Sequence, residues 1–173
     1  MIFLRHPRPA VAPGICYGRT DLDIGPGAAD EIAAALVATP AVTGVISSPA
    51  LRCRALAEAL AGRDGVTLRL DPRLVEMDFG AWEGLAWDAI GRAESDPWAD
   101  DPWTIAPPGG ESFGALHARV SAALEEVAPA TALVCHAGPI RAARMVLTGA
   151  SFEAVFAEPV PHATPIQFAV EAA

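Results

Sequence analysis

Short apolar runs alternate with segments of helical periodicity along most of this chain, and this alternation constrains the fold more than any other feature. The runs cover residues 2–4, 42–46, 66–70, 132–135 and 166–170. Apolar runs of this length, separated by helical patterns, are typical of strands joined by crossover helices, which makes neighbouring strands parallel. We therefore predict an α/β fold, a three-layer α/β/α sandwich with a largely parallel central sheet.

Four helical segments are predicted between these strands. They run from Pro26 to about Ala38, from about Ala50 to Gly62, from about Ser112 to Pro129, and from about Gly138 to Thr148. Proline is favoured in the first helical turn and glycine just past the last one, so Pro26, Gly62 and Gly149 act as start and stop signals. These bounds place Arg52 in the first turn of the second helix.

The length of the chain predicts a single domain over residues 1–173. A domain of this size buries roughly 70% of the surface of its unfolded chain, enough for a self-supporting core. Residues 87–108 differ from the rest, with three tryptophans, five acids and four prolines. We predict that they form an excursion outside the sheet, either a lid or a helical flap whose tryptophans cover the core.

Charge and composition exclude several classes of partner. Twenty-one acidic against twelve basic side chains give a net charge of −9, which argues against nucleic acid and anionic membranes. No apolar stretch approaches the roughly 18 to 20 residues of a membrane span. The start of the chain lacks a signal-peptide pattern, and three cysteines without metal-ligand spacing favour reduced thiols, so we expect a cytoplasmic protein. The sequence does not specify an oligomeric state.

Four basic side chains are predicted to meet at one edge of the sheet. Arg5 and His6 end the first strand, Arg52 begins a helix, and His136 follows another strand. The carboxyl ends of parallel strands meet at one edge, where such sheets bind ligands. Because arginine offers a planar fork to phosphate oxygens and a helix N-terminus adds N–H donors, the pattern predicts a phosphate site.

A phosphate site of this composition can support phosphoryl transfer. A neutral histidine can act as the nucleophile, while a second histidine and the arginines neutralise charge on the transferring group. The departing oxygen then needs a proton from a carboxylic acid. Glu76, on the loop after the third strand, is the best-placed candidate, although a loop acid can also serve only to bind backbone N–H groups.

In these motifs the chain closely resembles the histidine phosphatase superfamily, branch 1, also called phosphoglycerate mutase-like. The matching residues are Arg5 and His6, TDL at 20–22, SSP with Arg52, Glu76 within EMDFGAWEG, GGES from 109, and HAGPIR from His136. The resemblance implies a phosphohistidine intermediate on His6, phosphate held by Arg5, Arg52 and His136, Glu76 as proton donor, and no metal or cofactor. It also implies a small-molecule phosphomonoester as substrate, with water as the acceptor.

The segment CYGRTDL, residues 16–22, is most similar to α-ribazole phosphatases, which act on α-ribazole 5′-phosphate in cobalamin metabolism. That similarity implies that Arg19 reaches the phosphate or the substrate beyond it. Two positions depart from the family pattern. Pro7 and Pro9 stand where glycine and a hydroxyl residue are usual, and proline lacks an N–H for phosphate. Ala137 replaces a glycine after the second histidine, a change that keeps its N–H available to phosphate.

Three other interpretations compete with this one. Cys135 and Arg141 fit the spacing of cysteine-dependent phosphatases, in which a thiolate attacks phosphorus. Pro7 is compatible with a non-catalytic module that binds phospho-ligands, although such a module gains nothing from Glu76. A metal site formed by His6, His136 and Asp78 has no supporting spacing. We expect His117 and His162 to be structural.

Overall fold

The computed structural model describes residues 1–168 and contains a five-stranded sheet of order β3-β2-β4-β1-β5. The strands are β1 (Ile2–Arg5), β2 (Gly44–Ser47), β3 (Leu68–Leu70), β4 (Thr131–Cys135) and β5 (Pro165–Ile166). Three of the four pairings are parallel, and only β5 runs antiparallel to its neighbour β1. The predicted largely parallel sheet is therefore confirmed.

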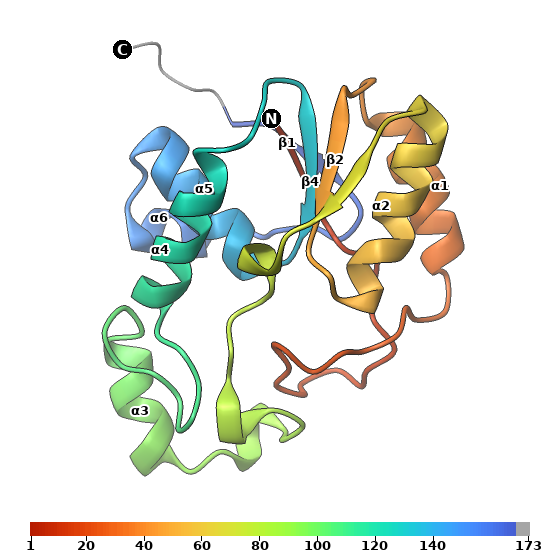
Figure 1. The fold of residues 1–173 in the computed structure, drawn as a ribbon. Helices are drawn as coiled ribbons and strands as arrows, with labels where there is room; N and C mark the ends of the chain where they lie inside the picture. The colour runs from red at the N-terminus through yellow and green to blue at the C-terminus, as the bar shows by residue number, and fades with distance from the viewer. Residues whose placement is uncertain (169–173) are drawn as a thin grey trace.

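Helices cover both faces of this sheet, which confirms the predicted three-layer sandwich. The helices are α1 (Ala28–Ala38), α2 (Leu51–Asp64), α3 (Arg92–Asp100), α4 (Phe113–Leu124), α5 (Ala137–Thr148) and α6 (Phe152–Ala157). Figure 1 shows α1 and α2 on one side of the sheet and α4, α5 and α6 on the other. Within residues 1–168 no helix combines the length and the apolar character needed to cross a membrane.

Several predicted boundaries differ from the structure. The strand predicted from residue 42 begins at Gly44, and the helix predicted to reach Pro129 ends at Leu124. The helix expected to stop at Gly62 continues to Asp64, because Gly65, with φ of 65°, is the residue that takes the left-handed end conformation. The third strand begins at Leu68, two residues later than predicted. The last strand is shorter and starts earlier, at Pro165, and positions 169 and 170 of its predicted range lie outside the described residues.

β4 lies in the middle of the sheet and every one of its residues is buried. Ala132 and Val134 face the core beneath α1 and α2, whereas Leu133 and Cys135 face the core beneath α4 and α5. A strand covered on both faces has no polar side, which explains its continuous apolar sequence. The sheet that carries the candidate site is therefore anchored on both sides.

The excursion outside the sheet is longer than the predicted range 87–108. The chain leaves the sheet at Pro72 and re-enters the helical layer at Phe113. Trp82 is buried beside Cys16 and Ile90, and Trp82 and Trp87 both pack against Trp98, at ring-centroid distances of 5.4 and 6.0 Å. In Figure 1 this segment and the loop that follows β1 lie together below the sheet.

Three backbone hydrogen bonds join the excursion to the loop after β1. The N–H of Cys16 donates to the carbonyl of Leu85 at 2.8 Å, and the N–H of Gly84 donates to the carbonyl of Cys16 at 2.9 Å. The N–H of Trp87 donates to the carbonyl of Gly14 at 2.9 Å. The tryptophans thus form a small core of their own with a segment distant in sequence. That residues 87–108 act as a lid stays a prediction.

Truncation of Leu133 tests the central strand as the anchor of the fold. Leu133 has no solvent exposure, so Leu133→Ala leaves a cavity and should lower the free energy of unfolding by about 2–5 kcal/mol. Leu70→Ala is the matched control, since Leu70 is 45% exposed on edge strand β3, and its effect should stay within about 0.5 kcal/mol. Urea denaturation measures both, and equal losses would contradict the assignment of the core.

Candidate active site

The register of the parallel strands brings the two predicted histidines together. Arg5 pairs with Cys135 across β1 and β4, so the residues that follow them, His6 and His136, emerge at the same edge. Their rings meet edge to face with centroids 5.1 Å apart. The predicted convergence of these two side chains is therefore observed, and it follows from strand pairing alone.

One ring nitrogen of His6 is committed to a backbone hydrogen bond. Nδ1 lies 2.7 Å from the carbonyl oxygen of Pro7, and a carbonyl can only accept, so Nδ1 carries the proton. A neutral ring then has its lone pair on Nε2. Burial lowers the pKa of His6 well below its usual value, and the charges of Arg52 and Arg5 act in the same direction. Pro7 lacks an N–H, but its carbonyl still orients the ring of His6.

His136 is fully buried and contacts the loop after β2. Its Nε2 lies 2.8 Å from the hydroxyl oxygen of Ser48 and 3.4 Å from the sulfur of Cys53. Burial is the main cause that lowers the pKa of His136 well below its usual value, with His6 and Arg52 as further causes. The sequence analysis used the SSP motif only to locate Arg52 and missed Ser48 as a partner of the histidine.

Two arginines surround the histidines without an acidic partner. The Nη atoms of Arg52, which has no solvent exposure, donate to the carbonyls of Thr20 and Gly18 at 2.7 and 2.6 Å. Arg5 donates through Nη1 to the carbonyl of Val160 at 2.9 Å. Within residues 1–168 neither guanidinium forms an ion pair, and both Nε atoms are buried without an acceptor. Buried cations are normally paired with anions, so this arrangement is suited to an anionic ligand.

Glu76 lies on the loop after β3, and its carboxylate reaches the start of α5, two residues after His136. Its Oε1 accepts hydrogen bonds from the N–H groups of Met77 at 2.9 Å and Gly138 at 3.1 Å. A side chain at position 138 would place Cβ 2.2 Å from that oxygen, so glycine is what permits this approach. The acid is thus held where the helix N-terminus also attracts negative charge.

Arg119 fixes the loop that carries Glu76, and the sequence analysis missed it. Its guanidinium donates to the carbonyls of Arg73, Val75 and Glu76 at 2.6, 2.7 and 3.0 Å. The same group forms an ion pair with Glu111 at 2.6 Å. Glu111 belongs to the GGES motif, so its partner could have been sought from that motif. Nothing in the sequence, however, distinguishes Arg119 from an ordinary arginine on a helix surface.

Arg19 contacts acids in this structure. Its guanidinium lies 3.4 Å from Asp78 and 3.6 Å from Glu111, and its side chain is 47% exposed. Its predicted contact with phosphate stays a prediction. Ala137 is the first residue of α5, where backbone N–H groups have no partner inside the helix, so a contact between its N–H and phosphate also stays a prediction.

A cavity of about 360 Å³ adjoins this cluster. It is lined by residues from the loop after β1, from α2 and its preceding turn, from the loop after β3 and from the end of β4: Gly18, Arg19, Asp21, Pro49, Ala50, Arg52, Pro72, Val75, Glu76 and His136. The cavity therefore joins Arg52, Glu76 and His136 in one space, and Arg5 and His6 are not among its lining residues. Among residues 1–168 no three His, Cys, Asp or Glu side chains are grouped so that they could hold a metal ion.

Cys135 and Arg141 lie in surroundings that do not favour a thiolate nucleophile. Cys135 is fully buried in β4, and burial raises the pKa of its thiol well above the usual value. Arg141 donates from Nε to the carbonyl of Val155 at 3.3 Å and covers the ring of Phe156 at 4.6 Å. The thiol is therefore neutral near physiological pH, and the arginine is committed to α6.

His162, expected to be structural, touches the candidate nucleophile directly. Its Nδ1 donates to the carbonyl oxygen of His6 at 2.8 Å, and the two rings lie 5.2 Å apart. Position 162 precedes β5, which pairs with β1 and so brings a residue from the far end of the chain to the site. No motif in the sequence signals this contact.

The profile of the histidine phosphatase superfamily, branch 1, matches residues 1–170 of this chain. The chain therefore belongs to that superfamily, as the motifs predicted. Family membership and the observed sandwich together define a histidine phosphatase fold.

Two related sequences show how far the similarity extends. A putative phosphoserine phosphatase 2 from Hydrogenobacter thermophilus is 31% identical over 151 residues, which cover 81% of this chain and 73% of that protein. A bifunctional protein from Mycobacterium tuberculosis is 42% identical over 84 residues, or 46% of this chain. That match spans only 22% of the length of the bifunctional protein.

Solved structures of similar proteins share the fold. A mycobacterial glucosyl-3-phosphoglycerate phosphatase superposes with a TM-score of 0.77 at 27% identity, covering 91% of this chain and 82% of that one. A protein from Thermus thermophilus superposes with a TM-score of 0.70 at 30% identity, covering 84% and 83% of the two chains.

The two buried histidines predict a loss of stability on acidification. In the unfolded chain they take up protons near pH 6.5, whereas in the folded protein they stay neutral to lower pH. The unfolded state therefore binds more protons below pH 6.5, and each histidine lowers the free energy of unfolding by up to about 1.4 kcal/mol per pH unit.

Urea denaturation between pH 7.5 and 5.5 measures this slope. His6→Asn should reduce it below pH 6.5, because one of three histidines whose pKa is lowered by burial is removed, His162 being the third. His117→Asn is the matched control, since His117 lies on α4 against Trp103, and it should leave the slope unchanged. An unchanged slope in His6→Asn would show that His6 takes up its proton at the same pH in the folded protein as in the unfolded chain.

Proposed function

We propose that this protein hydrolyses a phosphate monoester through a phosphohistidine formed on Nε2 of His6. The observation that carries the proposal is the pairing of a neutral, oriented histidine with two acid-free arginines. Nδ1 of His6 is engaged by the Pro7 carbonyl, while Arg5 and Arg52 each keep a buried Nε without an acceptor. A nucleophile with a free lone pair thus packs against His136, which lines the pocket together with Arg52.

The first half of the proposed reaction transfers the phosphoryl group to the enzyme. Nε2 of His6 forms a bond to phosphorus as the bond from phosphorus to the ester oxygen breaks. The departing alcohol takes the proton of Glu76, which becomes a carboxylate. Arg5, Arg52 and His136 stabilise the negative charge on the transferring oxygens, because charge-assisted donors in a dry site are stronger than water.

The second half returns the enzyme to its starting state. Water attacks phosphorus and gives its proton to the Glu76 carboxylate, while the bond from phosphorus to Nε2 breaks and its electron pair returns to His6. Inorganic phosphate then leaves. The fixed loop supports both steps, because Arg119 holds the backbone of residues 73–76 and Gly138 lets the Glu76 carboxylate approach α5.

For the substrate we propose a small phosphomonoester, with α-ribazole 5′-phosphate as the specific candidate. The similarity of residues 16–22 to α-ribazole phosphatases supports that choice, and Cys16 and Gly18 of this segment contact the excursion and Arg52. The names of two related proteins also refer to small esters, glucosyl-3-phosphoglycerate and phosphoserine. A phosphate-release screen should include all three esters.

The nucleophile is tested by trapping the phosphoenzyme. Rapid quench with ³²P-labelled substrate should leave label that survives base and is lost in acid, as expected for a phosphoramidate. His6→Ala should carry none, because the ring nitrogen proposed to bond to phosphorus is then absent. Gel autoradiography after base and acid treatment measures the label, and label retained by His6→Ala would remove His6 as nucleophile.

Cys135→Ala is the matched control for that experiment. A buried, neutral thiol contributes packing, so the variant should form the phosphoenzyme and keep its activity within several-fold. Abolished turnover with intact folding would transfer the role to the thiol. If the wild-type protein binds a phosphate ester but neither takes up label nor releases phosphate, the chain is a binding module for phospho-ligands.

The role of Glu76 is tested through the leaving group. An alkoxide leaves poorly without a proton, whereas nitrophenolate is stable near neutral pH, and a general acid is worth about 10² to 10⁴ in rate where a proton is needed. In single-turnover measurements Glu76→Gln should therefore slow phosphoenzyme formation strongly for an alkyl phosphate and weakly for p-nitrophenyl phosphate. Asp78→Asn is the control, because Asp78 pairs with Arg19, and it should not show this selectivity. Equal losses with both esters would mean that Glu76 only shapes the pocket.

A further inference from the structure

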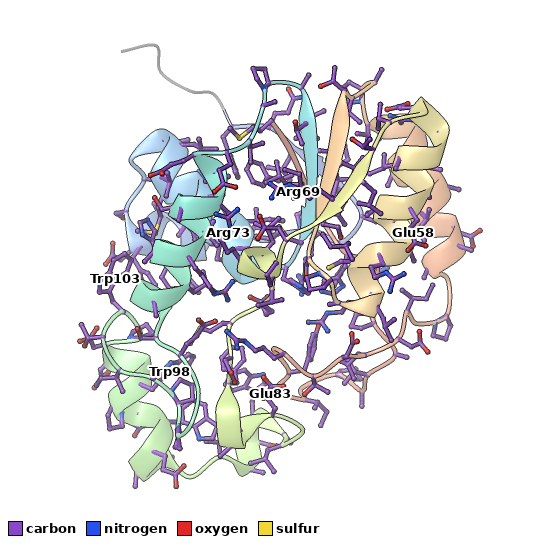
Figure 2. The ribbon with its side chains drawn as sticks, in the orientation of Figure 1. Glu58, Arg69, Arg73, Glu83, Trp98 and Trp103 are labelled. Atoms are coloured by element: carbon purple, nitrogen blue, oxygen red, sulfur yellow. The ribbon has the colours of Figure 1, made fainter. Side chains whose placement is uncertain are left out.

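A second cavity, of about 320 Å³, adjoins the site on the other side of Glu76. Five of its twelve lining residues are aromatic and come from four parts of the chain: Phe79, Trp98 of α3, Phe113 of α4, and Phe152 and Phe156 of α6. We refer to this space as the aromatic chamber. Figure 2 shows Trp98 on α3, within the excursion and below the sheet. The chamber therefore lies between the excursion and the helices on the α4 side.

The size of the chamber sets it apart from a packing defect. Protein interiors are close-packed and rarely leave voids larger than a water molecule, which occupies about 30 Å³. A volume of about 320 Å³ falls instead at the lower end of the range of roughly 300 to 1,000 Å³ that is typical of ligand pockets. Phe152 and Phe156 stack at 4.3 Å and Phe113 packs edge-on against both, so the wall is rigid.

Glu76 connects the chamber to the phosphate pocket. Its side chain lines both cavities, and the chamber is also bounded by Ala137 and Gly138 at the start of α5, next to His136. An ester oxygen that receives a proton from Glu76 would thus lie at the junction of the two spaces. The carbon skeleton attached to that oxygen can extend directly into the chamber.

One cation, Arg141, is part of the chamber wall. It lies over the ring of Phe156 at 4.6 Å, and within residues 1–168 no carboxylate is close enough to form an ion pair with it. Guanidinium groups stack on aromatic faces and donate to ring heteroatoms. Aromatic rings with a single stacked arginine suit a flat, apolar group of a ligand.

We propose that the aromatic chamber binds the alcohol half of the ester, and that the substrates are phosphomonoesters whose alcohol carries an aromatic or other flat apolar group. This inference rests on the proposed function for the position of the phosphate. It also assigns a role to the excursion, since Trp98 and Ala99 of α3 form part of the chamber wall. The chamber is then a specificity determinant, separate from the groups that transfer the phosphoryl.

Binding of two phosphonates to the wild-type protein tests the chamber without any turnover, because their C–P bond is not hydrolysed. In isothermal titration, 3-(1-naphthyl)propylphosphonate should bind at least tenfold more tightly than propylphosphonate. Ala99→Trp should remove most of that difference, because the exposed Ala99 lines the chamber and a larger side chain would fill it. Ala93→Trp is the matched control, on the same helix but outside the chamber, and should retain the difference.

Three outcomes would overturn the inference. They are equal affinity of the two phosphonates, a difference that Ala99→Trp leaves intact, and tighter binding of 3-phosphonopropionate, which would assign Arg141 to a substrate carboxylate. Phosphate release from the corresponding naphthyl and alkyl esters separates this inference from the proposed function. Release without a binding preference counts against the chamber alone, and a binding preference without release counts against the hydrolytic function alone.

Discussion

The parallel pairing of β1 with β4 is the constraint on which the rest of the site depends. Its register places Arg5 opposite Cys135, so that the next residue of each strand is a histidine at the same edge. A shift of one residue would move every side chain of a strand to the opposite face and separate the rings. Because β4 is buried on both faces, the two apolar cores hold this register. Packing far from the site therefore sets the distance between His6 and His136.

The electrostatics of the site oppose those of the whole molecule. The chain carries a net charge of −9, yet Arg5 and Arg52 enter a region whose histidines are neutral, and neither arginine meets an acid within residues 1–168. Burying Arg52 and partly burying Arg5 without an anion is unfavourable, and so is keeping two histidines neutral below pH 6.5. In the folded protein, the packing of the sheet compensates for both unfavourable contributions. A bound phosphate group would relieve the first of them, which couples ligand binding to stability.

Glu76 occupies the point where three parts of the molecule meet. The loop after β3 carries it, Arg119 of α4 fixes that loop, and the start of α5 receives its carboxylate. The phosphate pocket and the aromatic chamber lie on its two sides. In the proposed function, one side chain thus separates the space for the chemistry from the space for recognition. The part of the excursion after Glu76 lines the second space and not the first, so substrate preference would be able to change while the transfer machinery stays intact.

Much of the site could be predicted because the ends of strands can be recognised in the sequence. An apolar run that stops at Arg5 and His6, and another that stops at Cys135 before His136, locate both histidines at one edge once the sheet is parallel. The helix start after SSP does the same for Arg52. Other predictions failed where the signal was not local. Gly62 resembles a helix stop as much as Gly65 does, and only the backbone conformation distinguishes them.

The sequence by itself determined the sandwich, the parallel sheet and the motif residues, since apolar periodicity and local spacing dictate elements and the order in which they end. Only the tertiary structure decided the partners of those residues. Ser48 beside His136, His162 behind His6, Arg119 under the Glu76 loop and the chamber around Trp98 all join segments distant in the chain. Such contacts depend on how helices pack on the sheet in three dimensions. A hydrogen bond or a cavity between remote segments produces no periodic pattern in the sequence of either segment alone.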